Sequence, residues 1–152
     1  MPLQEGKAAH KRFAVQDRVR WSDVDKAGII YFGSYVRFFE IAETELFREI
    51  GLPYSTAFDV IDSYPVRAQF HCDFRSPAYL DDMLSVEIWV GSIGSTSLNL
   101  EFEIKRTKSE KGQLGETLMT GHCVLVTVNR ETYKAVRVHE RLREALRDYV
   151  KP

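Results

Sequence analysis

The stretch from Trp21 to Glu40, WSDVDKAGIIYFGSYVRFFE, is the most informative part of the chain for its fold and for a candidate site. An alternating, strand-like run of apolar residues ends where this stretch begins. A loop with Asp23 and Asp25 follows, and Gly33 and Ser34 then open a helix. A helix N-terminus offers unpaired backbone N–H groups and partial positive charge, and a carboxylate beside it offers a base or a nucleophile. The arrangement therefore favours a catalytic site at the entry to this helix.

The composition is that of an ordinary globular protein. The chain has 152 residues, with 44% hydrophobic residues, 28% charged residues and a net charge of −1. We therefore expect one domain over residues 1–152, with residues 1–11 as a mobile tail. No charge excess indicates a nucleic-acid partner, and no segment reaches the roughly 20 apolar residues of a membrane helix. We expect a cytoplasmic protein whose two cysteines, Cys72 and Cys123, are buried free thiols.

The periodicity of apolar residues predicts an α+β domain. Alternation predicts strands over 13–21, 66–74, 84–90, 98–104 and 118–128, and helical spacing predicts helices over 35–50 and 140–150. The strand over 118–128 is apolar on both sides, which indicates an interior strand. Residues 52–63 are expected to be an irregular connection. Runs of strands joined by short loops favour an antiparallel sheet that covers the long helix. Trp89 on the polar face of that sheet hints at an oligomer interface.

The motif Asp23-Val-Asp25-Lys-Ala-Gly28-Ile-Ile-Tyr31-Phe-Gly-Ser-Tyr35 and the element order resemble the hot-dog-fold acyl-CoA thioesterases, in the 4-hydroxybenzoyl-CoA thioesterase branch. Tyr64-Pro-Val66, the turn Pro77-Ala-Tyr-Leu-Asp81-Asp82 and Ser95-Thr-Ser97 extend the resemblance over about residues 15–138. The resemblance implies five antiparallel strands wrapped around one long central helix, with a short C-terminal helix. It also implies hydrolysis of an acyl-CoA to a free acid and CoA by a homo-oligomer, either a dimer or a homotetramer.

The family pattern assigns roles to residues of this chain. Asp25 is the catalytic carboxylate, as nucleophile or general base, and the backbone amides of Phe32 and Gly33 polarise the thioester carbonyl. The expected substrate-binding residues are Trp21, Gly28, Tyr31, Tyr35, Tyr64, Pro65, Val66, Ser95, Thr96 and Ser97. The acyl group is expected between the helix start of one chain and residues 64–66 of its neighbour. The aromatic residues favour an aromatic acyl group.

The chain departs from the family pattern at two positions. Some bacterial relatives carry a histidine where this chain has Phe32, and the 4-hydroxybenzoyl-CoA branch has basic residues where this chain has 91–95, GSIGS. The chain's contacts to the CoA nucleotide must therefore differ. Two alternative functions stay open. One is a hot-dog acyl-thioester dehydratase or hydratase, which is disfavoured because no histidine follows Asp25 within the helix-entry segment. The other is a non-enzymatic acyl-CoA sensor.

Simpler structural roles account for several other polar residues. Asp23 and the pair Asp81-Asp82 are typical of turn and loop residues that bind their own backbone. Ser34 precedes a helix without a nucleophile-elbow motif, so we expect a helix cap. No further carboxylate or histidine lies near enough in sequence to make Asp23 and Asp25 a metal site. We expect no metal and no cofactor.

Overall fold

The structure, a computed structural model, describes residues 10–152. Most of the expected tail, residues 1–9, lies outside the described residues. The adjoining segment is tied down, because the amide of Lys11 donates to the carbonyl of Asp148 at 2.9 Å. Among the described residues, no helix has the length and apolarity needed to cross a membrane.

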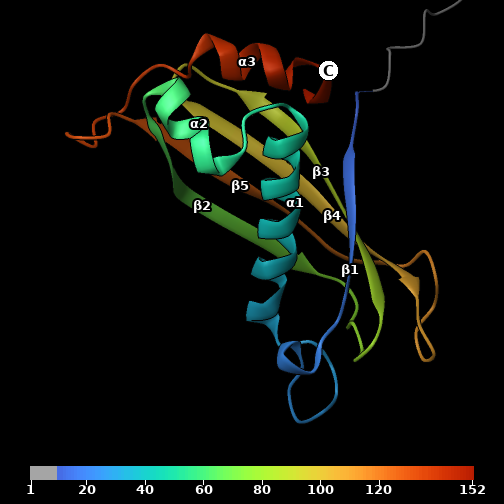
Figure 1. Cartoon of the computed structure of the whole chain (residues 1–152). Helices are drawn as coiled ribbons and strands as arrows, with labels where there is room; N and C mark the ends of the chain where they lie inside the picture. Colours follow the sequence, from blue (N-terminus) through green and yellow to red (C-terminus); the bar gives the residue numbers. More distant parts are fainter. Residues whose placement is uncertain (1–9) are drawn as a thin grey trace, which may run out of the picture.

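Five antiparallel strands form one sheet in the order β1-β3-β4-β5-β2 (Figure 1). Their bounds are β1 (Phe13–Arg18), β2 (Tyr64–Phe74), β3 (Met83–Ile93), β4 (Ser97–Lys108) and β5 (Thr117–Val128). The predicted interior position of residues 118–128 is confirmed, because β5 lies between β4 and β2. Its outer face is only partly covered, since Val124 and Val126 are half-buried. The sheet edges are β1 and β2.

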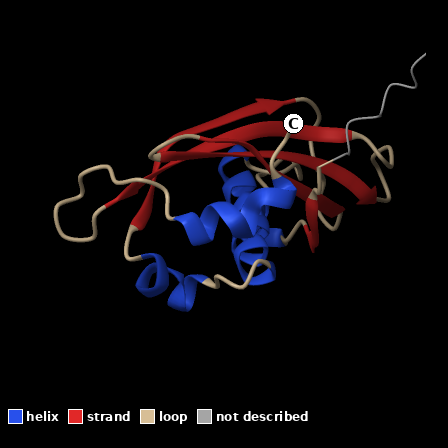
Figure 2. Ribbon diagram, turned by 90° about the horizontal axis from the view of Figure 1, so that it is seen from above, coloured by secondary structure: helices blue, strands red, loops and turns tan. Residues whose placement is uncertain are grey.

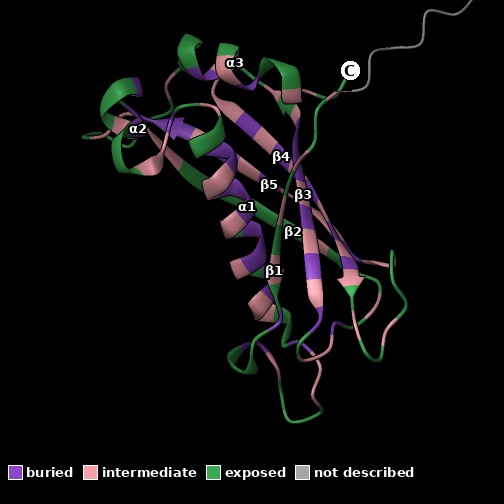
Figure 3. Ribbon diagram, turned by 45° about the vertical axis from the view of Figure 1, so that its right-hand side comes forward, coloured by how far each residue is buried: buried purple, intermediate pink, exposed green. Residues whose placement is uncertain are grey.

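The long helix α1 (Tyr35–Glu49) packs on one face of the sheet, and all the helices lie on that side (Figure 2). Its buried stripe includes Phe38, Phe39, Ala42 and Leu46, each at most 1% exposed. The Phe39 ring lies 4.7 Å from that of Phe102 on β4, between ring centroids. On the sheet, buried and half-buried residues alternate along the first part of β3 (Figure 3), as expected for a strand with one face against the helix. Each fully buried large apolar side chain contributes about 1.5–3 kcal/mol, so this stripe fixes the helix on the sheet.

The prediction of an irregular connection over 52–63 is wrong, because helix α2 (Tyr54–Ile61) occupies most of it. Tertiary contacts stabilise this short helix. The Tyr54 ring lies 4.7 Å from that of Phe47, and its hydroxyl donates to Glu43, which is buried within α1. The predicted C-terminal helix is confirmed as α3 (Glu140–Leu146), followed by a 3-10 turn, Arg147–Tyr149.

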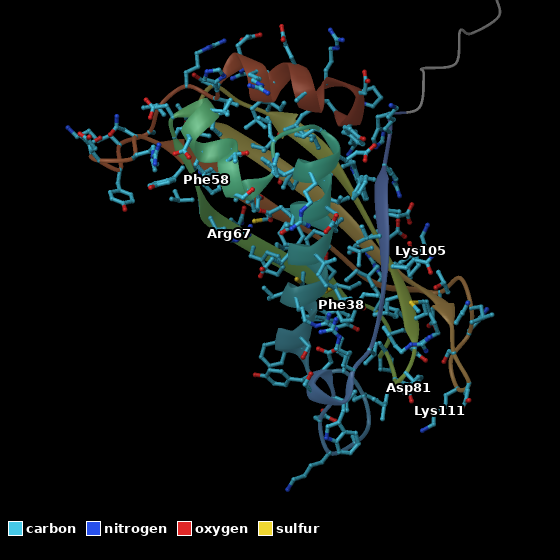
Figure 4. The ribbon with its side chains drawn as sticks, in the orientation of Figure 1. Phe38, Phe58, Arg67, Asp81, Lys105 and Lys111 are labelled. Atoms are coloured by element: carbon cyan, nitrogen blue, oxygen red, sulfur yellow. The ribbon has the colours of Figure 1, made fainter. Side chains whose placement is uncertain are left out.

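A bulge in β2 changes which of its side chains face the helix. The register with β5 shifts between Arg67 and Gln69, so strict alternation from residue 66 to 74 does not hold. Arg67 consequently reaches the buried carboxylate of Glu43, with Nη1 to Oε2 at 2.7 Å (Figure 4). The predicted β1 is also too long: the strand ends at Arg18, and Trp21–Asp23 form a 3-10 turn.

Arg37 joins α1 to the segment that precedes the helix. Its Nε donates to Asp23 Oδ1 at 3.0 Å, its Nη2 donates to Asp23 Oδ2, and its Nη1 donates to Asp17 Oδ2 at 2.6 Å. The Asp23 side chain is 5% exposed. Burial raises the pKa of Asp17, but the hydrogen bonds and positive charge of Arg37 outweigh it, so that the pKa lies below its ordinary value of 3.8. Arg37 thus holds strand β1, the loop and the helix together.

We predict that Arg37→Met lowers the free energy of unfolding at pH 7 by about 3 kcal/mol, because it leaves the buried Asp23 carboxylate without its cation. Asp17 has a lowered pKa in the folded state, so its contribution is present above pH 3.8 and is lost as the pH falls through the folded value. The difference from wild type should therefore narrow in acid. Urea unfolding between pH 3 and 7 measures both effects. The control Arg48→Met, in an exposed pair with Glu45, should change stability by less than about 1 kcal/mol, and equal losses from both variants would contradict the role of Arg37.

Candidate active site

A pocket of about 620 Å³ opens beside the loop that precedes α1. This loop lies at the end of the molecule that is lowest in Figure 1. The pocket is lined by Trp21, Val24, Asp25, Lys26, Gly28 and Leu80. Three of the residues expected at the site, Trp21, Asp25 and Gly28, therefore border one cavity. Trp21 is 80% exposed in the single chain, so a large aromatic surface at the pocket mouth is free to contact a ligand or another chain.

The backbone of the loop fixes the Asp25 carboxylate. The amide of Asp25 donates to Ile29 at 2.9 Å, and the amide of Gly28 donates back to the carbonyl of Asp25 at 3.0 Å. Gly28 has φ +76°, a conformation that side chains disfavour. Asp25 Oδ1 accepts from the amide of Ala27 at 2.8 Å, whereas Oδ2 has no hydrogen-bond partner among residues 10–152. The carboxylate is exposed, oriented and free on one oxygen.

The amide of Gly28 does not join a set of oxyanion donors, because it is already bonded to Asp25. Gly28 still borders the pocket, where its missing side chain leaves the loop compact.

Two other amides stand free at the helix entry. Phe32 and Gly33 lie in the 3-10 turn Phe32–Ser34 that leads into α1, and neither amide has an acceptor within the described part of the chain. A Cβ at Gly33 would lie 2.7 Å from Tyr31 Cε1, so glycine lets that ring fold back against the turn. The Tyr31 and Phe32 rings lie 4.7 Å apart and are 52% and 64% exposed. The entry thus combines unpaired donors with exposed aromatic surface.

Asp23 connects the loop to the helix entry instead of forming a second acid at the site. Its carbonyl accepts from the Tyr31 amide at 2.8 Å and from the Ser34 hydroxyl at 3.0 Å. Its carboxylate is occupied by Arg37 and by the Arg20 amide, at 2.8 Å. The expectation that the Ser34 side chain caps α1 is wrong, because its hydroxyl is committed to Asp23. These bonds tie the loop to the entry of the helix.

Tyr35 begins the helix and is buried, at 3% exposure. Its ring lies 5.6 Å from the ring of Phe74, the last residue of β2. Burial raises the pKa of Tyr35 to about 12, so its hydroxyl stays protonated at neutral pH. The Tyr35 side chain therefore contributes a neutral aromatic wall near the helix entry.

The remaining expected substrate-binding residues lie at the opposite end of the sheet. Val66 and Ser97 both pair with Val126, near the end of β5, which places residues 64–66 and 95–97 at one end. Phe74, beside the helix entry, pairs with Met119 near the start of β5. A single chain therefore does not bring Tyr64, Pro65, Val66, Ser95, Thr96 or Ser97 to the Asp25 pocket.

Sequence reasoning missed three residues that line the pocket, Val24, Lys26 and Leu80. Lys26 directly follows Asp25, and its charge next to the candidate carboxylate was the only feature of the sequence that pointed to it. Leu80 comes from the turn between β2 and β3, whose Tyr-Leu-Asp-Asp motif was the only pointer to it. No group of three or more His, Cys, Asp or Glu side chains within residues 10–152 is arranged to hold a metal ion.

Comparison with known proteins places this chain in a family. Residues 19–146 match the family described as the thioesterase-like superfamily. The acyl-CoA thioester hydrolase YbgC of Escherichia coli is 32% identical over 107 residues, which cover 70% of this chain and 78% of that protein. The acyl-CoA thioesterase YbgC of Haemophilus influenzae is 30% identical over 94 residues, covering 62% of this chain and 69% of that protein.

Solved structures share the fold. A 1,4-dihydroxy-2-naphthoyl-CoA thioesterase from Synechocystis superposes with a TM-score of 0.80 at 20% identity, over 91% of this chain and 97% of that one. The gentisyl-coenzyme A thioesterase BH1999 gives a TM-score of 0.73 at 21% identity, over 86% and 98% of the two chains. These neighbours confirm the predicted hot-dog fold. The chain belongs to the thioesterase-like superfamily and is a thioester hydrolase.

Proposed function

We propose that this protein hydrolyses an acyl-CoA to the free acid and CoA, with Asp25 as the catalytic carboxylate. One observation carries the proposal: an oriented carboxylate with one free oxygen lies on a loop bonded to a helix entry with two unpaired amides. The relatives named acyl-CoA thioester hydrolases support CoA as the carrier. The Synechocystis and gentisyl-CoA enzymes support an aromatic acyl group, as do the exposed rings of Trp21 and Tyr31.

In the proposed reaction the thioester carbonyl oxygen accepts hydrogen bonds from the backbone amides of Phe32 and Gly33. One such donor is worth about 10²–10³ in rate at a developing oxyanion. Asp25 either adds to the carbonyl carbon, giving an anhydride that water opens, or removes a proton from the attacking water. In both routes the carbon–sulfur bond breaks and CoA leaves as a thiolate. A thiol with a pKa of about 8.5 is a good leaving group, so no second acid is required.

We predict that Asp25→Asn lowers kcat for acyl-CoA hydrolysis by at least about 10²-fold, because the amide is neither a base nor a nucleophile of comparable strength. The measurement is thiol release from a panel of aliphatic and aromatic acyl-CoAs. Asp148→Asn, an exposed aspartate at the far end of the molecule, is the matched control and should retain wild-type turnover. Unchanged turnover in Asp25→Asn would remove Asp25 from its role. Tight binding without turnover in the wild type would favour an acyl-CoA sensor instead.

We further propose that two chains pair through β2 to complete each site. The two sheet edges differ: β1 has 6 residues, whereas β2 has 11 and carries exposed apolar side chains, including Val66, Phe70 and Phe74. A long, uncovered apolar edge strand is a template for another strand. Antiparallel pairing centred on Gln69 would set Tyr64 of one copy opposite Phe74 of the other. Residues 64–66 would then reach the partner's helix entry.

We predict that Ala68→Lys shifts the protein towards monomers and lowers its turnover, because two like charges would meet near the centre of the paired strands. Sedimentation velocity over a range of concentrations measures the assembly, and thiol release measures the activity. Ala14→Lys puts the same charge on the other edge strand, β1, and should leave both quantities unchanged. A wild-type protein that is monomeric and fully active would contradict pairing through β2.

A further inference from the structure

One buried guanidinium joins two loops at the active-site end of the molecule. Arg106, near the end of β4, is 1% exposed. Its Nε donates to Asp82 Oδ2 at 2.9 Å, and its Nη2 donates to the carbonyl of Pro77, so it holds both ends of the turn 77–82. Its Nη1 donates to Glu116 Oε2 at 2.6 Å and to the carbonyl of Gln113 at 3.1 Å, in the loop between β4 and β5. Asp81 and Lys111, labelled in Figure 4, mark these two loops.

The turn 77–82 supports the Asp25 loop on both sides. Before Asp25, the amide of Val19 donates to the carbonyl of Asp82 at 2.8 Å. After Asp25, the amide of Ile30 donates to the carbonyl of Ala78 at 2.8 Å. Both carbonyl acceptors belong to the turn that Arg106 braces, so the position of the Asp25 loop depends on the shape of this turn.

The same turn also reaches the pocket. The amide of Leu80 donates to the carbonyl of Gly28 at 3.3 Å, and Leu80 lines the Asp25 pocket. Residues Ile29 and Tyr79 form an isolated antiparallel bridge between loop and turn. The Arg106 guanidinium lies 5.4 Å from the centroid of the Tyr79 ring. A continuous set of bonds therefore runs from Arg106 through the turn to the wall of the pocket.

Gly112 provides an independent view of how closely this guanidinium is enclosed. A Cβ at position 112 would lie 2.2 Å from Arg106 Cζ and 2.3 Å from Nε. Only a residue without a side chain lets the β4–β5 loop pass over Arg106 in this way. An alanine at this position would displace the guanidinium without changing any charge.

We propose that Arg106 is a positioning residue for the reaction, acting through Asp82 and the turn 77–82 to hold Asp25 in register with the Phe32 and Gly33 amides. The inference rests on the proposed function. Arg106 itself lies outside the pocket lining and contacts no reacting atom. Its removal should displace the loop by a fraction of an ångström to an ångström, and displacements of that size cost up to about 10²-fold in rate.

The test compares steady-state kinetics and backbone hydrogen exchange in Arg106→Lys, Asp82→Asn and Gly112→Ala. Arg106→Lys and Asp82→Asn should lower kcat by about 10- to 100-fold while KM changes less than about 3-fold. Gly112→Ala should act in the same direction. The amides of Val19, Ile30 and Leu80 should exchange faster in all three variants, because the turn no longer holds them.

Two controls separate positioning from loss of stability. Leu142→Ala opens a cavity under α3, at the other end of the molecule, and should lower the melting temperature while kcat and exchange at Val19 and Ile30 stay at wild-type values. Glu110→Ala, in the same loop as Gly112, should leave kinetics unchanged. The inference would be overturned if Arg106→Lys and Gly112→Ala both kept wild-type kcat, or if Leu142→Ala lost as much kcat as they do. Either result would leave the proposed function intact. A wild type without turnover would overturn the proposed function and this inference with it.

Discussion

The structure depends on the burial of the α1 stripe against one face of the sheet. Phe39 packs against both Phe70 of β2 and Phe102 of β4, with ring centroids 5.3 and 4.7 Å away, and those two rings stack on each other at 5.6 Å. Because this packing fixes the axis of the helix, it also fixes where the helix begins. The entry with the Phe32 and Gly33 amides consequently has one position relative to the sheet, and the loop with Asp25 must meet it there. The hydrogen bonds of Arg37 and of the Ser34 hydroxyl to Asp23 fix the loop in that position.

The sequence was sufficient to predict the sheet, the long helix and the C-terminal helix, because each has a strong period set by burial of one face. It did not predict α2, whose formation depends on Tyr54 meeting Glu43 and Phe47 in space. It also did not predict the bulge that turns Arg67 inward, since a one-residue register shift leaves no mark on an alternating pattern. Both misses concern contacts between different helices and strands, which the pattern within one segment does not contain.

The candidate site also has parts that the sequence predicted and parts that it did not. The family resemblance assigned Trp21, Asp25 and Gly28 to one site, and these residues border one pocket because one short stretch of sequence carries all three. Leu80 and Arg106 belong to distant segments, and only folding brings them to this end of the molecule. The structure also showed that the Gly28 amide is already bonded, whereas the Phe32 and Gly33 amides have no acceptor among residues 10–152. Hydrogen-bond occupancy of that kind follows from backbone geometry, which residue types alone do not specify.

The length of β2 has a consequence for how the family can diversify. The ten steps from its first residue to its last span about 33 Å at roughly 3.3 Å per step, so Tyr64 and Phe74 are much farther apart than a side chain reaches. The proposed catalytic residues and the residues at the far end of the strand are thus well separated within one chain. In the proposed pair, a substitution at the far end would therefore change the surface offered to the neighbouring copy's site without touching the chain's own Asp25 loop.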